Sequence, residues 1–108
     1  MDVSLSVYGK LQTAELRLLR LKNERALLYR EIAIDVAVSI IQGLKNDIIW
    51  GVVSAESDLQ TIMNFAEEVL LSFAFPQSEE QSPYASNLET LTSILGQYRP
   101  QFERFRLR

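Results

Sequence analysis

Two acidic residues one helical turn apart, Glu31 and Asp35, carry side chains of the kind that binds divalent cations. A helix would place both carboxylates on one face. Glu67 and Glu68 form a second acidic pair. Neither spacing matches an established metal motif, and the simpler interpretation is surface acids, with Asp35 pairing with a Lys or Arg. The sequence therefore predicts no metal site and no bound cofactor.

The residues that most often perform catalysis are missing from this chain. It contains no His and no Cys, so it has neither the commonest general acid and base nor a thiolate nucleophile. Its four glycines are isolated and do not form a phosphate-binding loop. We therefore expect that the protein is not an enzyme.

Charge is sorted along the chain, although the net charge is only −3. Residues 10–30 are mainly basic, residues 46–98 hold eight acids and no Lys or Arg, and the last ten residues are again basic. Such blocks usually form solvated faces and complementary contacts within or between subunits. A second interpretation is a strip that follows nucleic-acid phosphates, made of Arg17, Arg20, Lys22 and Arg25.

Three aromatic residues are candidates for partner binding. Trp50 lies beside Gly51 in an apolar segment and would be either a core anchor or an interface anchor. Phe65 and Phe75 lie partly off the best apolar face of their predicted helix. That face is either a wide core face or an exposed patch for a partner.

Three segments have the periodicity of helices. Residues 10–30 place Leu11, Ala14 and Leu18 on the alternating spacing of a heptad seam, which Ile32 would extend. Residues 57–75 have an unbroken apolar face and begin with the capping pattern of Ser57 and Gln60. Residues 87–98 form a third helix, and we expect a kink or break at Pro100.

The segment 31–53 supports two interpretations. Apolar and small or polar residues alternate over 32–40, which is typical of a half-buried strand. The helical spacing of Val36, Ile40, Leu44 and Ile48 favours a buried helix instead, with a break near Gly43 or Gly51.

We thus predict an all-α fold: a three- to four-helix bundle with a long N-terminal helix, in which residues 1–108 form one domain. Residues 76–85 are expected to be an exposed loop and residues 99–108 a basic C-terminal tail. A homodimer through the first helix is expected. The alternative fold is α+β, with a hairpin at 32–53.

The function predicted from these features is that of a non-catalytic helical interaction protein, such as an adaptor, a chaperone or an assembly or regulatory factor. The alternative is a helical nucleic-acid binder, for example a dimeric double-stranded RNA binder that uses the basic first helix. A cytoplasmic location is expected, because residues 1–11 do not resemble a signal peptide and the most apolar stretch carries charges. The residues predicted to bind partners are Arg17, Arg20, Lys22, Arg25, Trp50, Phe65 and Phe75.

Overall fold

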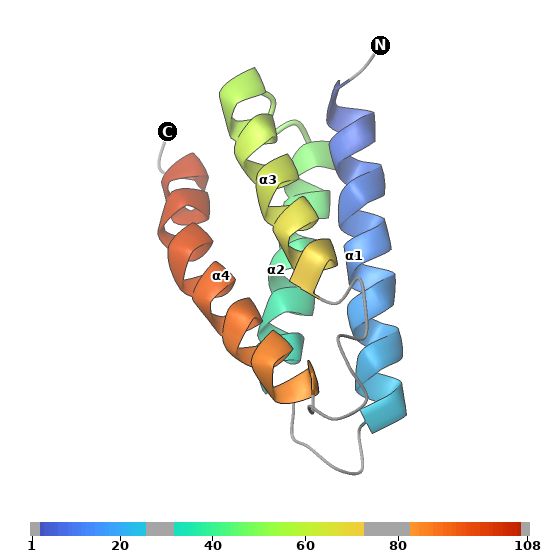
Figure 1. Ribbon diagram of the computed structural model, residues 1–108. Coiled ribbons are helices and arrows are strands. Elements are labelled where there is room, and N and C mark those ends of the chain that lie inside the picture. The colour runs from blue at the N-terminus through green and yellow to red at the C-terminus, as the bar shows by residue number, and fades with distance from the viewer. Residues whose placement is uncertain (1–2, 26–31, 73–82, 107–108) are drawn as a thin grey trace.

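The computed structural model describes residues 3–25, 32–72 and 83–106, except for the side chains of Leu21, Arg106 and residues 23–25 and 83–88. Within these ranges the chain forms four α-helices and no strand (Figure 1). They are α1 (Val3–Arg25), α2 (Ile32–Ile49), α3 (Glu56–Ser72) and α4 (Pro83–Arg106). The predicted all-α bundle is confirmed, and the hairpin at 32–53 is wrong.

The helices occupy the four corners of a bundle. α1 and α4 each pack against both α2 and α3, so α1 lies diagonally opposite α4, and α2 diagonally opposite α3. α1 and α3 run in one direction, while α2 and α4 run in the other (Figure 1). Because α2 and α3 lie on a diagonal, the connection between them, residues 50–55, crosses the end of the bundle. Val53 in this connection is buried and closes that end of the core.

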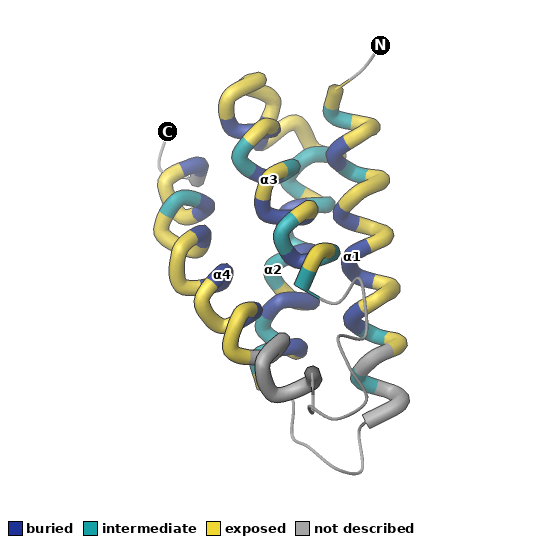
Figure 2. The backbone as a smooth tube through the Cα atoms, viewed as in Figure 1, coloured by how far each residue is buried: buried dark blue, intermediate teal, exposed yellow. Residues whose placement is uncertain are grey.

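Helix α1 buries one narrow stripe, which faces the centre of the bundle (Figure 2). Its members are Val7, Leu11, Ala14 and Leu18, spaced alternately by four and three residues. The predicted seam is therefore right within α1. Ile32 does not extend the seam, because it begins a separate helix, α2, and is exposed there.

Helix α2 resolves the ambiguity of its segment. The residues that reach the core are Ile34, Ala37, Val38, Ile41 and Leu44, which recur every three or four residues. Apart from the exposed Ile32, the β-branched residues that suggested a strand are divided between this face and its half-buried flanks, where Val36 and Ile40 lie. Packing against α1 and α4 outweighs the modest β-propensity of these side chains. Gly43 lies inside the helix, and the predicted break is found near Gly51.

Helices α3 and α4 both differ in extent from the predictions. α3 begins at Glu56, and the amide of Leu59 donates a hydrogen bond of 2.9 Å to the carbonyl of Ala55. Because the helix begins before Ser57, this residue lies inside the first turn and is not the N-cap of the predicted capping box. The side chain of Gln60 donates a hydrogen bond to Asn64. α4 begins at Pro83, so residues 83–85, which were predicted as part of an exposed loop over 76–85, are helical. Residues 76–82 lie outside the described ranges.

Of the kink or break expected at Pro100, the break is wrong, because α4 continues through this residue to Arg106. Most of the segment 99–108 is thus helix, continuous with the rest of α4. Phe102 and Phe105 explain why the helix persists: both are buried on its inner side, and they anchor the turns after the proline. Burial of two aromatic side chains offsets the hydrogen bond that Pro100 cannot donate.

Candidate functional site

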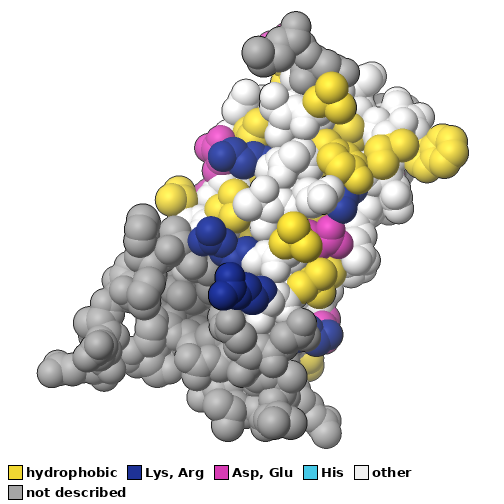
Figure 3. Space-filling model, turned by 90° about the vertical axis from the view of Figure 1, so that its right-hand side faces the viewer, with side chains coloured by type: hydrophobic (Ala, Val, Ile, Leu, Met, Phe, Trp, Pro, Cys, Tyr) yellow, Lys and Arg dark blue, Asp and Glu magenta, His cyan; other side chains and the backbone are white. Residues whose placement is uncertain are grey.

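Exposed hydrophobic residues gather at one end of the bundle. Among the described residues, eight large hydrophobic side chains are exposed, and five of them lie at the start of α1 or at the turn after α2. We call these five the end patch: Val3, Leu5, Ile49, Trp50 and Val52. Trp50 is the most exposed of them, at 80%. Figure 3, which faces α1, shows hydrophobic side chains toward this end of the molecule. A concentrated apolar surface of this kind is typical of a binding site.

A Schellman motif at the end of α2 holds Trp50 and Val52 away from the core. The amide of Val52 donates a hydrogen bond of 2.8 Å to the carbonyl of Asp47. The amide of Gly51 donates a hydrogen bond of 3.2 Å to the carbonyl of Ile48. Gly51 takes the left-handed conformation that this motif requires, with φ of +73°. The chain therefore reverses sharply after Trp50, and the next side chain to enter the core is that of Val53.

A groove lies between α1 and α2 beside the end patch. Its volume is about 370 Å³, and it is lined by Ser4, Leu5, Tyr8, Ile48 and Ile49. We call it the α1–α2 groove. The ammonium of Lys45 lies 5.1 Å from the centre of the Tyr8 ring, a cation–π contact that fixes one wall. None of the five lining residues carries a formal charge, so the groove suits an uncharged group.

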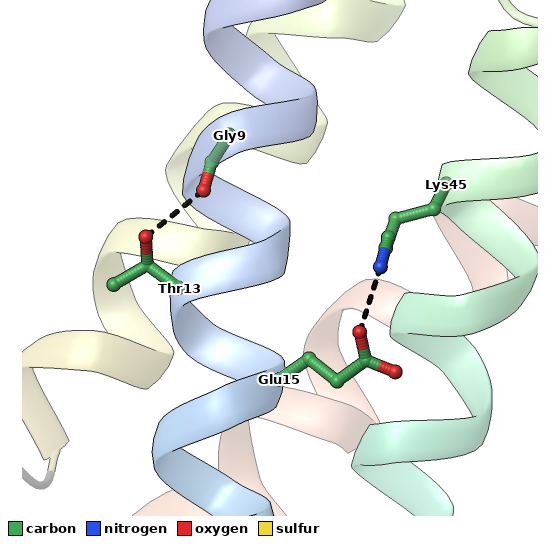
Figure 4. Close-up of polar contacts among 4 residues, drawn as sticks. All are labelled: Gly9, Thr13, Glu15 and Lys45. Atoms are coloured by element: carbon green, nitrogen blue, oxygen red, sulfur yellow. Dashed lines mark hydrogen bonds and ion pairs between the residues drawn. The ribbon is translucent and has the colours of Figure 1, made fainter.

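An ion pair in the middle of the α1–α2 interface holds these two helices in register. The Nζ atom of Lys45 donates a hydrogen bond of 2.8 Å to Oε1 of Glu15, and both side chains are largely buried (Figure 4). Burial opposes the charge on Glu15, but hydrogen bonds from Lys45 and Gln42 and the charge of Lys45 outweigh it and lower the pKa of Glu15. The hydrogen bond to Glu15 raises the pKa of Lys45 against the opposing effect of burial. The pair positions Tyr8 through Lys45.

The predicted basic strip is only partly assembled. Arg17 and Arg20 are exposed on α1, and Figure 3 shows Lys and Arg side chains on that face. Lys22 forms an ion pair with Asp35 of α2, which confirms the interpretation of Asp35 as the partner of a basic residue. Arg17 and Arg20 each have an interaction partner in the structure. The side chain of Arg25 lies outside those described.

The structure separates the three predicted aromatic residues. Trp50 is exposed, so its interpretation as a core anchor is wrong. Phe65 is fully buried, so its interpretation as a partner-binding residue is wrong. Its ring lies 5.0 Å from Phe102 and 5.5 Å from Tyr98, with edge-to-face geometry in both pairs. Phe75 lies outside the described residues.

The acidic pairs considered for metal binding do not form a cluster where the structure describes them. No group of three or more Asp and Glu side chains lies together in the described part of the chain, and Glu31 is outside it. Glu68 of α3 instead influences the titration of Tyr98 on α4. Burial, together with the Glu68 carboxylate, raises the pKa of Tyr98 to about 12. We assign this interaction to the packing of the two helices.

A second groove, between α2 and α4, has mixed lining. Its volume is about 230 Å³, and its charged members are Asp47, Arg99 and Glu103. Ser39, Ile40, Gly43, Leu44 and Phe102 complete it. Opposite charges side by side neutralise one another, so this groove lacks the single sign of charge that would select an ion.

Of the eight residues in the end patch and the α1–α2 groove, sequence reasoning predicted only Trp50. The seven that it missed are Val3, Ser4, Leu5, Tyr8, Ile48, Ile49 and Val52. The relevant signal was the run of apolar residues on both sides of Gly51, since a helix that stops within such a run must leave some of them outside the core. At the start of α1, Leu5 lies off the spacing of the buried seam. Val3 lies four residues before Val7 but is still exposed at the end of the bundle.

No described helix is long and apolar enough to span a membrane. Comparison with known proteins yields no match: no family model, no curated protein and no solved structure is significantly similar to this chain.

Proposed function

We propose that this protein is a non-catalytic helical interaction protein, such as an adaptor, a chaperone or an assembly or regulatory factor, and that it binds a protein partner through the end patch. The observation that carries the proposal is the concentration of exposed hydrophobic residues there, with Trp50 at its tip. Trp is among the residues most enriched at the energetic centres of protein interfaces. The absence of His and Cys from the chain supports a role without catalysis.

The size of the patch is adequate for a specific contact. A Trp side chain buries about 200 Å² in an interface, and with four aliphatic neighbours the patch presents roughly 500 Å² of apolar surface. At about 25 cal/mol per Å², covering this area contributes about 12 kcal/mol before the cost of association. Because the Schellman motif fixes the backbone around Trp50, little of this free energy is spent on ordering the turn.

Photo-crosslinking tests the proposal directly. A photo-reactive amino acid in place of Val52 should give a discrete protein adduct in cells that make this protein, and Trp50→Ser should abolish it. The control is the same photo-reactive amino acid in place of Leu71, which is equally apolar and exposed but lies at the far end of α3. Equal adducts from both positions, or none from position 52, would contradict the proposal.

Nucleic-acid binding is the second candidate, and the observation in its favour is the exposure of Arg17 and Arg20 on one helix. The ion pair between Lys22 and Asp35 weighs against it, because phosphate contacts would have to compete with that carboxylate. Solution mass measured at low salt with short duplex RNA decides the matter. A complex that disappears in Arg20→Glu and in high salt would establish this function instead.

A further inference from the structure

The end patch combines a projecting side chain with a recess that can receive it. Trp50 extends from the turn after α2 with 80% of its surface exposed. The α1–α2 groove begins at the two residues that precede it, Ile48 and Ile49. Within a single molecule, Trp50 does not occupy this groove. A surface that carries a projection and its matching recess side by side is complementary to itself when rotated by a two-fold axis.

We propose that the partner of the end patch is a second copy of this chain, bound about a two-fold axis so that Trp50 of each protomer enters the α1–α2 groove of the other. The inference rests on the function proposed above and names its partner. Each protomer thus inserts its own Trp50 and receives the Trp50 of the other at the same contact, so the two insertions form together in a closed dimer.

The dimensions of the groove support this occupant. Its volume of about 370 Å³ lies in the range of pockets that hold small organic groups and admits an indole. Leu5 and Ile49 line it with exposed aliphatic surface, and Tyr8 offers a ring that Lys45 holds in place. An indole would thus meet aliphatic and aromatic surface.

Charge also favours a second copy. The chain has a net charge of −3, so two copies repel one another unless their contact avoids acidic groups. The end patch and the α1–α2 groove contain no ionisable group other than the Tyr8 hydroxyl. Lys45, which lies next to the groove, is neutralised by Glu15. The residues of the end patch and the groove therefore bring no like charges of their own together.

The area is that of a small dimer interface. Two end patches of roughly 500 Å² each, with the walls of both grooves, approach the lower limit of about 1,200 Å² for specific interfaces. We therefore expect a dimer that dissociates on dilution into the micromolar range.

Mass measured by sedimentation equilibrium tests the dimer. From micromolar to millimolar concentration, the mass should rise from 12.4 kDa toward twice that value. Trp50 is the only Trp of the chain, so its emission should shift to shorter wavelength with the same midpoint. Trp50→Ala should weaken association at least about tenfold, the loss typical of an interface anchor. Leu71→Ala, the matched control, should associate like the unaltered chain.

A second variant blocks the groove without disturbing the fold. Leu5→Asp places a carboxylate in the groove, and its position in the first turn of α1 suits the helix dipole. Leu5→Asp alone should remain monomeric with unshifted emission. The Trp50→Ala protein has an intact groove and contains no Trp. When it is added to the Leu5→Asp protein, the emission of the latter should shift to shorter wavelength, because Trp50 of the Leu5→Asp protein can still enter the groove of the Trp50→Ala protein.

Three results would overturn the dimer: a mass of 12.4 kDa at every concentration, association of Trp50→Ala that is as strong as that of the unaltered chain, or no shift on mixing the two variants. The crosslinking experiment distinguishes this failure from that of the proposed function. A monomer whose position 52 still captures another protein in cells would refute the second copy and leave the interaction function standing. A monomer that captures nothing would refute both.

Discussion

Replacing Phe65 with Ala tests whether the buried aromatic cluster holds the bundle together. Phe65 is fully buried and packs edge-to-face against Tyr98 and Phe102 of α4. Truncation of a buried Phe costs about 3–5 kcal/mol, depending on how far the cavity collapses. Each aromatic pair adds about 0.5–1.5 kcal/mol beyond the area buried, so we expect a loss in the upper part of that range, about 4–5 kcal/mol.

Such a loss is large for a domain of this size, whose total free energy of unfolding is about 5–15 kcal/mol. Phe65→Leu keeps most of the apolar volume and should cost only about 1–2 kcal/mol, mainly the two ring contacts. Leu71→Ala is the surface control, and it should change stability by less than about 0.5 kcal/mol because Leu71 is exposed.

Urea titration followed by far-ultraviolet circular dichroism is the appropriate assay. Trp50 is already exposed in the folded protein, so its fluorescence reports unfolding poorly. Dilute protein keeps any self-association from adding to the measured stability. A loss below about 2 kcal/mol for Phe65→Ala would refute the assignment of Phe65 to the core. It would restore the sequence-based interpretation of this residue as part of a binding face.

Four further changes test other contacts. The pKa of Glu15 is lowered, so its contribution to stability is lost as pH falls through the folded-state pKa of the carboxyl. The pKa of Lys45 is raised, so its contribution is lost as pH rises through the folded-state pKa of the ammonium. Urea titrations across pH should therefore give a flatter profile at both ends for Glu15→Gln/Lys45→Met, and an unchanged profile would count against the pair. The pKa of Tyr98 rises from 10.0 to about 12, so its contribution is complete below pH 10 and disappears between pH 10 and 12, a change of about 3 kcal/mol. Thermal unfolding of Tyr98→Phe should show a smaller alkaline loss, and an equally steep loss would assign it to other groups. Gly51→Ala should cost about 1–2 kcal/mol in urea because of the positive φ alone, since an added Cβ has nothing within 4 Å; no loss would mean that the turn relaxes. Pro100→Ala should stabilise α4 by about 1–3 kcal/mol because the residue is exposed and interior to the helix, and calorimetry that showed a lower Tm would contradict this.

Helices with strong local periodicity could be predicted from the sequence, because their signal depends only on neighbouring residues. The spacing of Leu11, Ala14 and Leu18 indicated the buried side of α1, and the structure confirms it. Phe65 could not be placed in this way. α3 has a broad apolar arc, and Phe65 lies in the part of it that faces α4, which local spacing does not identify. Which helix each part of the arc faces is a property of the whole fold.

The candidate site was predicted only in part, for a related reason. Trp50 was identified as a candidate anchor, but hydrophobicity alone favoured its burial. Its exposure follows from the hydrogen bonds of the turn at Gly51, which direct the chain away after Trp50 and return Val53 to the core. The groove beside it depends on the antiparallel register of α1 and α2, set by contacts between residues distant in sequence such as Glu15 and Lys45.

The diagonal placement of α2 and α3 has a consequence for how the chain folds. These helices are neighbours in sequence, but they do not cover each other's apolar faces, so the central half of the chain lacks a core of its own. Each requires α1 or α4 beside it. The pairing of α1 with α3 closes a loop that contains all of α2, and this costs more chain entropy than closing a local helical hairpin. Completing the core therefore requires contacts between helices that are not neighbours in sequence, α1 with α3 and α2 with α4.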